Sequence, residues 1–180
     1  FKQKTAYEIY VSGSSGTCID VSMQTFRVKK GQRVFCTKGL ASMGFGVPAT
    51  IGACLAGDRR RTVCVNGDGG FQMNIQELQT IIHHRMGIKI FLINNQGYHS
   101  IRQTQKNFFG EPLVGIGTDS HDLSFPDMEK LAWAYGYPYI AAHHNEELAE
   151  AVEKTLAVDG PVICEFFVTM DQNFEPKSSA

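Results

Sequence analysis

Two short polar stretches contain the residues best suited to hold a metal ion and a phosphate. Asp68 lies in the sequence GDGG directly after an apolar run, and Asn95 lies in the sequence NNQG after a later apolar run. Mg²⁺ takes about six oxygen ligands, commonly carboxylates and phosphates, and an amide oxygen can serve as well. Glycine lets the backbone approach a phosphate closely because it has no Cβ. Taken alone, Gly67–Gly70 is equally consistent with a tight turn and with a phosphate-binding loop. The second stretch favours a metal and phosphate site.

Other phosphate-binding motifs are not found in the sequence. No GxxxxGK followed by Ser or Thr occurs, which excludes a P-loop. The stretch GDGGFQ contains GxG, but Gln72 stands where a dinucleotide fingerprint has its third glycine or alanine. In GFGVPATIGA, Pro48 and Ala49 follow the GxG. Both departures disfavour a nicotinamide or flavin dinucleotide site.

Alternating strand and helix patterns surround the two stretches. Strands are expected at 7–13, 61–67, 88–95, 137–142 and 161–168, and helices at 42–57, 74–86, 125–136 and 145–160. Asn74 and Asn145 are expected to cap two of these helices, and 97–110 reads as a polar loop or a short helix.

This order predicts an α/β fold, in three layers: a doubly wound, mostly parallel sheet with helices on both faces. We expect a single domain over residues 1–180. Both polar stretches then follow strands, at the edge of the sheet where such folds bind ligands. They lie side by side if their strands are neighbours.

Composition narrows the classes of partner. The chain of 180 residues has 17 Lys plus Arg against 18 Asp plus Glu, so a net charge of -1 gives no surface for nucleic acid. No run of 18 apolar residues or signal peptide occurs, so we expect no membrane partner and a cytoplasmic location. The five cysteines form no CxxC pair, which indicates buried free thiols rather than a zinc or iron-sulfur site.

The motifs resemble those of a known enzyme family. GDG followed by NN after the 24 residues 70–93 is similar to the thiamine diphosphate signature. GLASMGFGVPATIGACLAG looks like the GxxxMGxGLPAAIGA block of acetolactate synthase and its relatives, and FQMNIQELQTII resembles the helix after their GDG. The resemblance covers roughly residues 7–171. It implies the thiamine diphosphate-binding fold of the C-terminal domain that binds the cofactor's diphosphate, in a fragment that lacks the pyrimidine-binding and middle domains.

The resemblance assigns metal and diphosphate ligands. Asp68, the Asn95 side chain and the Gly97 carbonyl would bind Mg²⁺ or Ca²⁺. Backbone groups of Gly69 and Gly70, with contacts near Tyr98, would hold the diphosphate. The Gly16-Thr17 turn would add further contacts.

The resemblance also assigns residues around the organic part of the cofactor. Met43 would wedge thiamine diphosphate into a V shape, and the Ala41 carbonyl with the Met43 amide would read its pyrimidine edge. A glutamate that contacts the pyrimidine comes from a neighbouring subunit in this family, which implies a homodimer or homotetramer with the cofactor at a subunit interface. The isolated domain should therefore be inactive.

The resemblance implies a thiamine diphosphate-dependent transferase or lyase that acts on a 2-oxo acid by decarboxylation, carbon-carbon bond formation or both. Thr104 stands where acetolactate synthases have a substrate-shaping Trp, and His99 and Ser100 replace a Gly-Met pair, so acetolactate synthesis does not follow. His99 is a candidate for proton transfer, with a loop histidine bonded to solvent or backbone as the alternative. FAD is possible in the full-length protein, but nothing here indicates it.

Two other functions stay open from the sequence. The first is a split-subunit 2-oxo acid decarboxylase whose pyrimidine-binding domain is a separate chain. The second is a non-catalytic nucleotide-binding or scaffold domain. An iron-sulfur-linked 2-oxo acid oxidoreductase subunit is disfavoured because the cysteines do not cluster.

Overall fold

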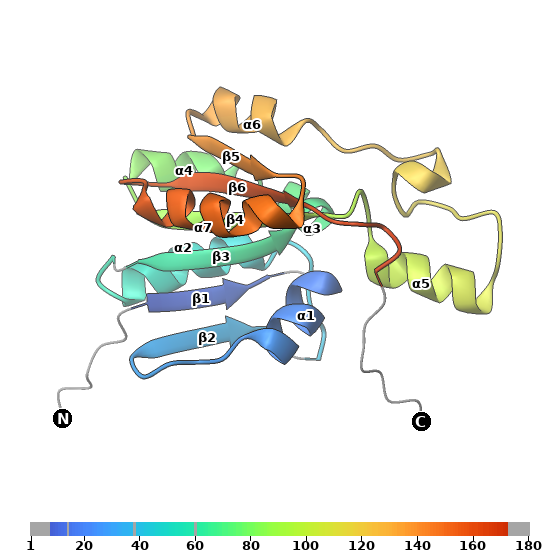
Figure 1. Cartoon of the computed structure of the whole chain (residues 1–180), viewed down its shortest axis with the longest axis horizontal. Coiled ribbons are helices and arrows are strands. Elements are labelled where there is room, and N and C mark those ends of the chain that lie inside the picture. Colours follow the sequence, from blue (N-terminus) through green and yellow to red (C-terminus); the bar gives the residue numbers. More distant parts are fainter. Residues whose placement is uncertain (1–7, 14, 38, 60, 173–180) are drawn as a thin grey trace.

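A six-stranded parallel sheet forms the centre of the computed structural model, which describes residues 8–13, 15–37, 39–59 and 61–172 (Figure 1). The strand order is β2-β1-β3-β4-β6-β5. The strands are β1 (Glu8–Ser12), β2 (Gln32–Cys36), β3 (Thr62–Gly67), β4 (Ile88–Asn94), β5 (Tyr139–Ala142) and β6 (Val162–Phe167). Most of β4 is buried, as expected for a central strand covered on both faces.

Helices cover both faces of this sheet, which confirms the three-layer prediction. One apolar cluster joins the sheet to α2 (Gly46–Ala56), α4 (Glu77–His83) and α6 (Met128–Tyr135). A second cluster joins the opposite face to α7 (Leu148–Ala157), and α1 (Thr17–Thr25) lies on that face too (Figure 1). The remaining helices are α3 (Asp68–Gln72), α5 (His99–Phe108) and the short 3-10 turns η1 (Thr118–Ser120) and η2 (Asn145–Glu147).

The strand order reverses direction beside β1. The chain goes from β1 to β2 on one side and then returns to β3 on the other side of β1. Open parallel sheets bind ligands outside the carboxyl ends of strands at such a reversal. β3 and β4 are direct neighbours, and Gly67 pairs with Ile93, so the two polar stretches do follow adjacent strand ends.

Four elements were not predicted from the sequence, and two predicted helix caps are wrong. The missed elements are the helix α1, the edge strand β2, the short helix α3 and the turn η1. Asn74 does not cap α4, which begins at Glu77; its side-chain amide instead donates to the Gly44 carbonyl at 2.7 Å. Asn145 begins the turn η2 rather than capping α7. Asparagine side chains suit helix caps, but Asn74 bonds to a distant loop and Asn145 lies in a turn.

The expected helix ends and the burial of most cysteines are confirmed. α2 ends at Gly57, α6 is followed by Gly136 in the left-handed conformation, and 97–110 contains the helix α5. The five cysteines are free thiols, and all but Cys36 are buried. None of the described helices is long and apolar enough to cross a membrane. The predicted first strand began at Tyr7, which lies outside the described residues.

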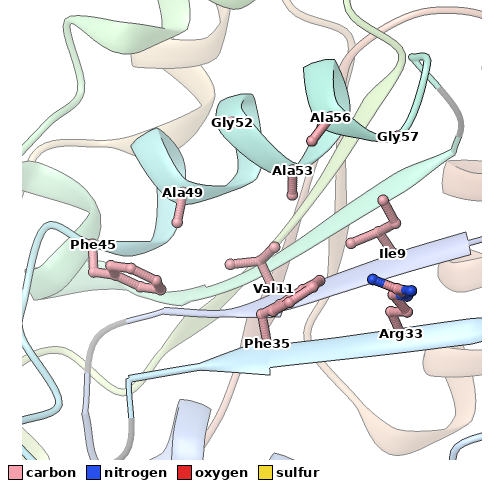
Figure 2. A pocket seen from close by; sticks show the side chains of 10 residues that line it. All are labelled: Ile9, Val11, Arg33, Phe35, Phe45, Ala49, Gly52, Ala53, Ala56 and Gly57. Atoms are coloured by element: carbon pink, nitrogen blue, oxygen red, sulfur yellow. The ribbon is translucent and has the colours of Figure 1, made fainter.

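An apolar groove of about 390 Å³ lies between α2 and the strands β1 and β2 (Figure 2). Its α2 side consists of small residues at helical spacing, and its floor includes the exposed ring of Phe35. Over this part of the sheet, no other described helix lines the groove. The lining residues are Ile9, Val11, Arg33, Phe35, Phe45, Ala49, Gly52, Ala53, Ala56 and Gly57.

Lys89 is expected to stabilise the turn between α7 and β6. Its buried ammonium group donates to the carbonyls of Val158 at 2.5 Å and Gly160 at 2.6 Å. Lys89→Met keeps the apolar stem but loses both charged hydrogen bonds, so it should lower the free energy of unfolding by about 2 kcal/mol. Urea denaturation checks this, with Lys154→Met as the control because Lys154 forms an exposed pair with Glu150. Equal effects of the two substitutions would contradict the assignment.

Candidate functional site

The predicted site residues gather at one small cavity at the carboxyl ends of β1, β3 and β4. Its volume is about 60 Å³, smaller than the groove beside α2, but its walls come from four separate strand-to-helix connections, those after β1, β2, β3 and β4. Ala41 is the one predicted site residue that does not line it. The predicted residues that do are Gly16, Thr17, Met43, Asp68, Gly69, Gly70, Asn95, Gly97, Tyr98 and His99.

Asp68 is the acidic group of this cavity. It is 1% exposed, its Oδ1 accepts from the Gly69 amide at 2.7 Å, and its Oδ2 accepts from the Gly97 amide at 3.0 Å. Burial raises the pKa of Asp68 to about 6, against the opposing effect of these amides and of the Arg102 charge. The carboxylate is thus desolvated, and none of the described lysine and arginine side chains forms an ion pair with it. A bound cation stabilises such a buried carboxylate.

Asn95 and Gly97 bring further oxygens to the same cavity. Asn95 is buried and follows the end of β4. A Cβ on Gly97 would lie 2.1 Å from the Ile116 carbonyl oxygen, and its φ of 152° is unfavourable for other residues, so the loop requires glycine there. No group of three His, Cys, Asp or Glu side chains that could hold a metal occurs among the described residues. A cation at Asp68 would therefore depend on amide, carbonyl and phosphate oxygens, as Mg²⁺ sites often do.

Gly69 allows close packing against Tyr98. A Cβ on Gly69 would lie 2.2 Å from Cε1 of Tyr98, so only glycine fits under this ring. The Gly69 amide already donates to Asp68, and it would have to exchange that partner to bind a phosphate oxygen. The helices α1 and α5 also begin at the cavity, and the first amides of a helix favour an anion.

Met43 lies at the mouth of the cavity. It is 38% exposed and lines the cavity from the loop before α2. The bond from Asn74 to the Gly44 carbonyl holds this loop to the segment between α3 and α4. Ala41 lies in the same loop with a φ of 47°, away from the cavity lining.

His99 begins α5 and is buried. Its ring interacts with the backbone of Met170 and Gln172, in the segment after β6. Burial, helped by the Arg102 charge, lowers the pKa of His99 against the opposing effect of the backbone of Gln172 and Met170, which favours the neutral ring at pH 7. The backbone contacts agree with the structural alternative for this histidine, and its role in proton transfer stays a prediction.

Sequence reasoning missed the pair Arg102 and Asp119. Arg102 is 1% exposed, and its Nε donates to Asp119 Oδ2 at 2.8 Å. Asp119 lies in the irregular connection after α5, where no periodic pattern points to a contact. The only signal was that Arg102 falls in the stretch QGYHSIRQTQ, where the sequence departs from acetolactate synthases.

Comparisons with known proteins show which family the chain belongs to. The family model described as "Thiamine pyrophosphate enzyme, C-terminal TPP binding domain" matches residues 15–166. The chain is 34% identical over 176 residues to the acetolactate synthase large subunit of Pyropia yezoensis, which covers 96% of this chain and 29% of that protein. It is 33% identical over 156 residues to the chloroplastic acetolactate synthase 2 of Nicotiana tabacum, covering 85% of this chain and 24% of that protein.

A third relative also matches most of this chain. The chloroplastic acetolactate synthase 2 of Brassica napus is 36% identical over 143 residues, covering 78% of this chain and 22% of that protein. The chain thus spans less than a third of the length of these relatives. The matched region contains the Asp68 and Asn95 stretches and the Met43 loop. This chain belongs to the thiamine pyrophosphate enzymes, as their C-terminal cofactor-binding domain.

Proposed function

We propose that this chain binds the diphosphate end of thiamine diphosphate through Mg²⁺, within a longer enzyme that acts on a 2-oxo acid. The reaction is decarboxylation, carbon-carbon bond formation or both. The observation that carries the proposal is the buried Asp68 carboxylate, which shares one cavity with Asn95 and Gly97. These residues follow the neighbouring strands β3 and β4, and β3 borders β1, beside which the strand order reverses. Sheets of this type bind ligands at the carboxyl ends of strands near such a reversal.

The residues present fit a metal-bound diphosphate. Asp68, the Asn95 side chain and the Gly97 carbonyl would hold the cation, and Ca²⁺ could replace Mg²⁺ because its ligands are also oxygens. The amides near Gly70 and at the starts of α1 and α5 would face the diphosphate oxygens. The cavity of about 60 Å³ has room for only a few atoms, so the rest of the cofactor would extend past Met43.

Thiamine diphosphate, when bound, supplies an electron sink for breaking or forming a bond beside a carbonyl carbon. The residues of this chain would position it: Met43 would support its bent shape, and Asp68 would fix the metal. His99 remains the candidate of this chain for moving a proton. Neutral imidazole can accept one, although its backbone contacts would have to open first.

The remaining parts of the active site would come from other polypeptide segments. We expect a homodimer or homotetramer with the cofactor at a subunit interface, a small 2-oxo acid as substrate, and a cytoplasmic enzyme. The exposed Met43 and the short span of this chain relative to its relatives support a site that another domain completes. FAD binding stays possible in the full-length protein, and none of the residues named above is proposed to bind FAD.

The 180-residue chain by itself is expected to show no turnover. The test is an assay of CO₂ release from pyruvate with thiamine diphosphate and Mg²⁺, alongside the full-length protein. Calorimetry of the full-length protein with both ligands should show that thiamine diphosphate binding requires the metal. Appreciable turnover by the isolated chain would contradict the shared site, and metal-independent binding would contradict the role of Asp68.

A further inference from the structure

The pair formed by buried Arg102 and half-buried Asp119 has no part in the function proposed so far. Arg102 forms two parallel bonds to this carboxylate, from Nε to Oδ2 at 2.8 Å and from Nη2 to Oδ1 at 3.0 Å. Nη2 also donates to the Gln96 carbonyl at 3.3 Å. The guanidinium group therefore joins three places: α5, the turn η1 and the loop that carries Asn95 and Gly97.

The two loop segments that Arg102 joins also bond to each other. The Tyr98 amide donates to the Ile116 carbonyl at 2.6 Å, and the Thr118 amide donates to the Gln96 carbonyl at 3.2 Å. Gly97 and Gly117 form an antiparallel bridge between these bonds. Residues 96–98 and 116–118 are thus a short two-stranded ladder.

The guanidinium group lies directly against this ladder. A Cβ on Gly97 would be 2.8 Å from Arg102 Nη2, and a Cβ on Gly117 would be 2.9 Å from the same atom. The ladder in turn reaches Asp68, because the Gly97 amide donates to Asp68 Oδ2 at 3.0 Å. A shift of the guanidinium group would therefore move the Gly97 peptide relative to Asp68.

Burying this arginine carries a cost that packing alone does not explain. Its Nη1 is buried and has no hydrogen-bond partner among the described residues, and a buried charge with an unmet donor destabilises a fold. A methionine or leucine would fill the same space without that cost. The charge and fork of arginine suit a site where geometry must be held.

We propose that Arg102, paired with Asp119, is a positioning residue that fixes the Gly97 carbonyl for the metal ion. This inference rests on the proposed metal and diphosphate site. Arg102 does not itself line the cavity, so it acts through the ladder of residues 96–98 and 116–118. Its loss should loosen the geometry of the ligands while leaving Asp68 and Asn95 in the chain.

The choice of metal separates positioning from simple structural support. Mg²⁺ demands near-ideal octahedral geometry, whereas Ca²⁺ accepts flexible coordination with more ligands. A misplaced Gly97 carbonyl should therefore weaken Mg²⁺ more than Ca²⁺. A loop that has only become less stable should weaken both ions by the same factor.

The experiment uses the full-length protein with saturating thiamine diphosphate and measures the dissociation constants of Mg²⁺ and Ca²⁺ by calorimetry. Arg102→Met and Asp119→Asn should each lose about 10–100-fold in Mg²⁺ affinity, as supporting residues of metal sites do, and lose less for Ca²⁺. Arg102→Lys, which keeps the charge but not the fork, should also lose more for Mg²⁺ than for Ca²⁺. Arg61→Met is the control, because Arg61 forms an exposed pair with Glu8 at 3.2 Å, away from the cavity.

Equal losses for the two ions, or an unchanged Mg²⁺ affinity in the folded variants, would overturn the positioning role. If Arg102→Met does not fold, Asp119→Asn and Arg102→Lys decide the question by the same ratio of losses. A parent protein that binds no Mg²⁺ with thiamine diphosphate would overturn the proposed function itself. A parent that binds, with variants that bind equally well, overturns only the positioning role.

Discussion

Asp68→Ala is expected to weaken Mg²⁺-dependent binding of thiamine diphosphate to the full-length protein by more than about 100-fold, because removing a direct ligand should cost more than removing a supporting residue. Among the residues that the structure describes, Asp68 is the one acidic side chain lining the cavity. Without it, amide and carbonyl oxygens alone would have to hold a divalent ion. Calorimetric titration with Mg²⁺ at a fixed, saturating cofactor concentration measures the loss.

The matched control for this change is Asp58→Asn. Asp58 is an exposed carboxylate in the turn after α2, and its φ of 54° is one that asparagine also tolerates. This variant should bind metal and cofactor as the parent does. Unchanged affinity in a folded Asp68→Ala protein would refute the assignment of Asp68 as a ligand.

Gly97→Ala should both destabilise the protein and weaken Mg²⁺ binding. The added Cβ would lie 2.1 Å from the Ile116 carbonyl oxygen. The hydrogen bonds of the ladder hold the backbone at Gly97 and at Ile116 in place. The φ of 152° adds strain for alanine. We expect a loss of about 3 kcal/mol in the free energy of unfolding, measured by urea denaturation, together with a weaker Mg²⁺ titration.

Gly87→Ala is the control for Gly97→Ala. A Cβ on Gly87 would have no atom within 4 Å, and this glycine precedes β4 at the opposite end from the cavity. Its effect should stay within about 0.5 kcal/mol. A Gly97→Ala protein with the stability and metal affinity of the parent would show that the loop relaxes freely, and the geometry described for it would then be wrong.

The parts of the fold that the sequence predicted correctly are those with strong local signals. The apolar run of β4 and the glycine that ends α2 mark these elements without reference to the rest of the chain. α1 and β2 were missed because their sequences, TCIDVSMQT and QRVFC, lack a clear helical stripe and an unbroken apolar run. β2 is an edge strand, and its pairing with β1 rather than its composition defines it.

The candidate site shows the same division. The two polar stretches and the glycines within them indicated a metal and phosphate site. These stretches come together because β3 and β4 are adjacent strands. The contacts that hold the site come from residues far apart in sequence. Asn74 bonds to Gly44, and Arg102 bonds to Asp119 across an irregular segment. No helix, strand or turn pattern in the sequence predicts either contact.

The sequence by itself determined the family, the α/β fold class and the polar stretches that we propose hold the cofactor's diphosphate and metal, because these depend on local patterns and motif spacing. Only the tertiary structure decided that Ala41 stays off the cavity lining, that His99 lies near the backbone after β6, and that Arg102 bonds to the Gln96 carbonyl beside Gly97. The physical reason is that burial and hydrogen-bond partners arise from packing between distant segments. A sequence pattern gives the types and spacing of residues, but it does not show which distant residues become their neighbours.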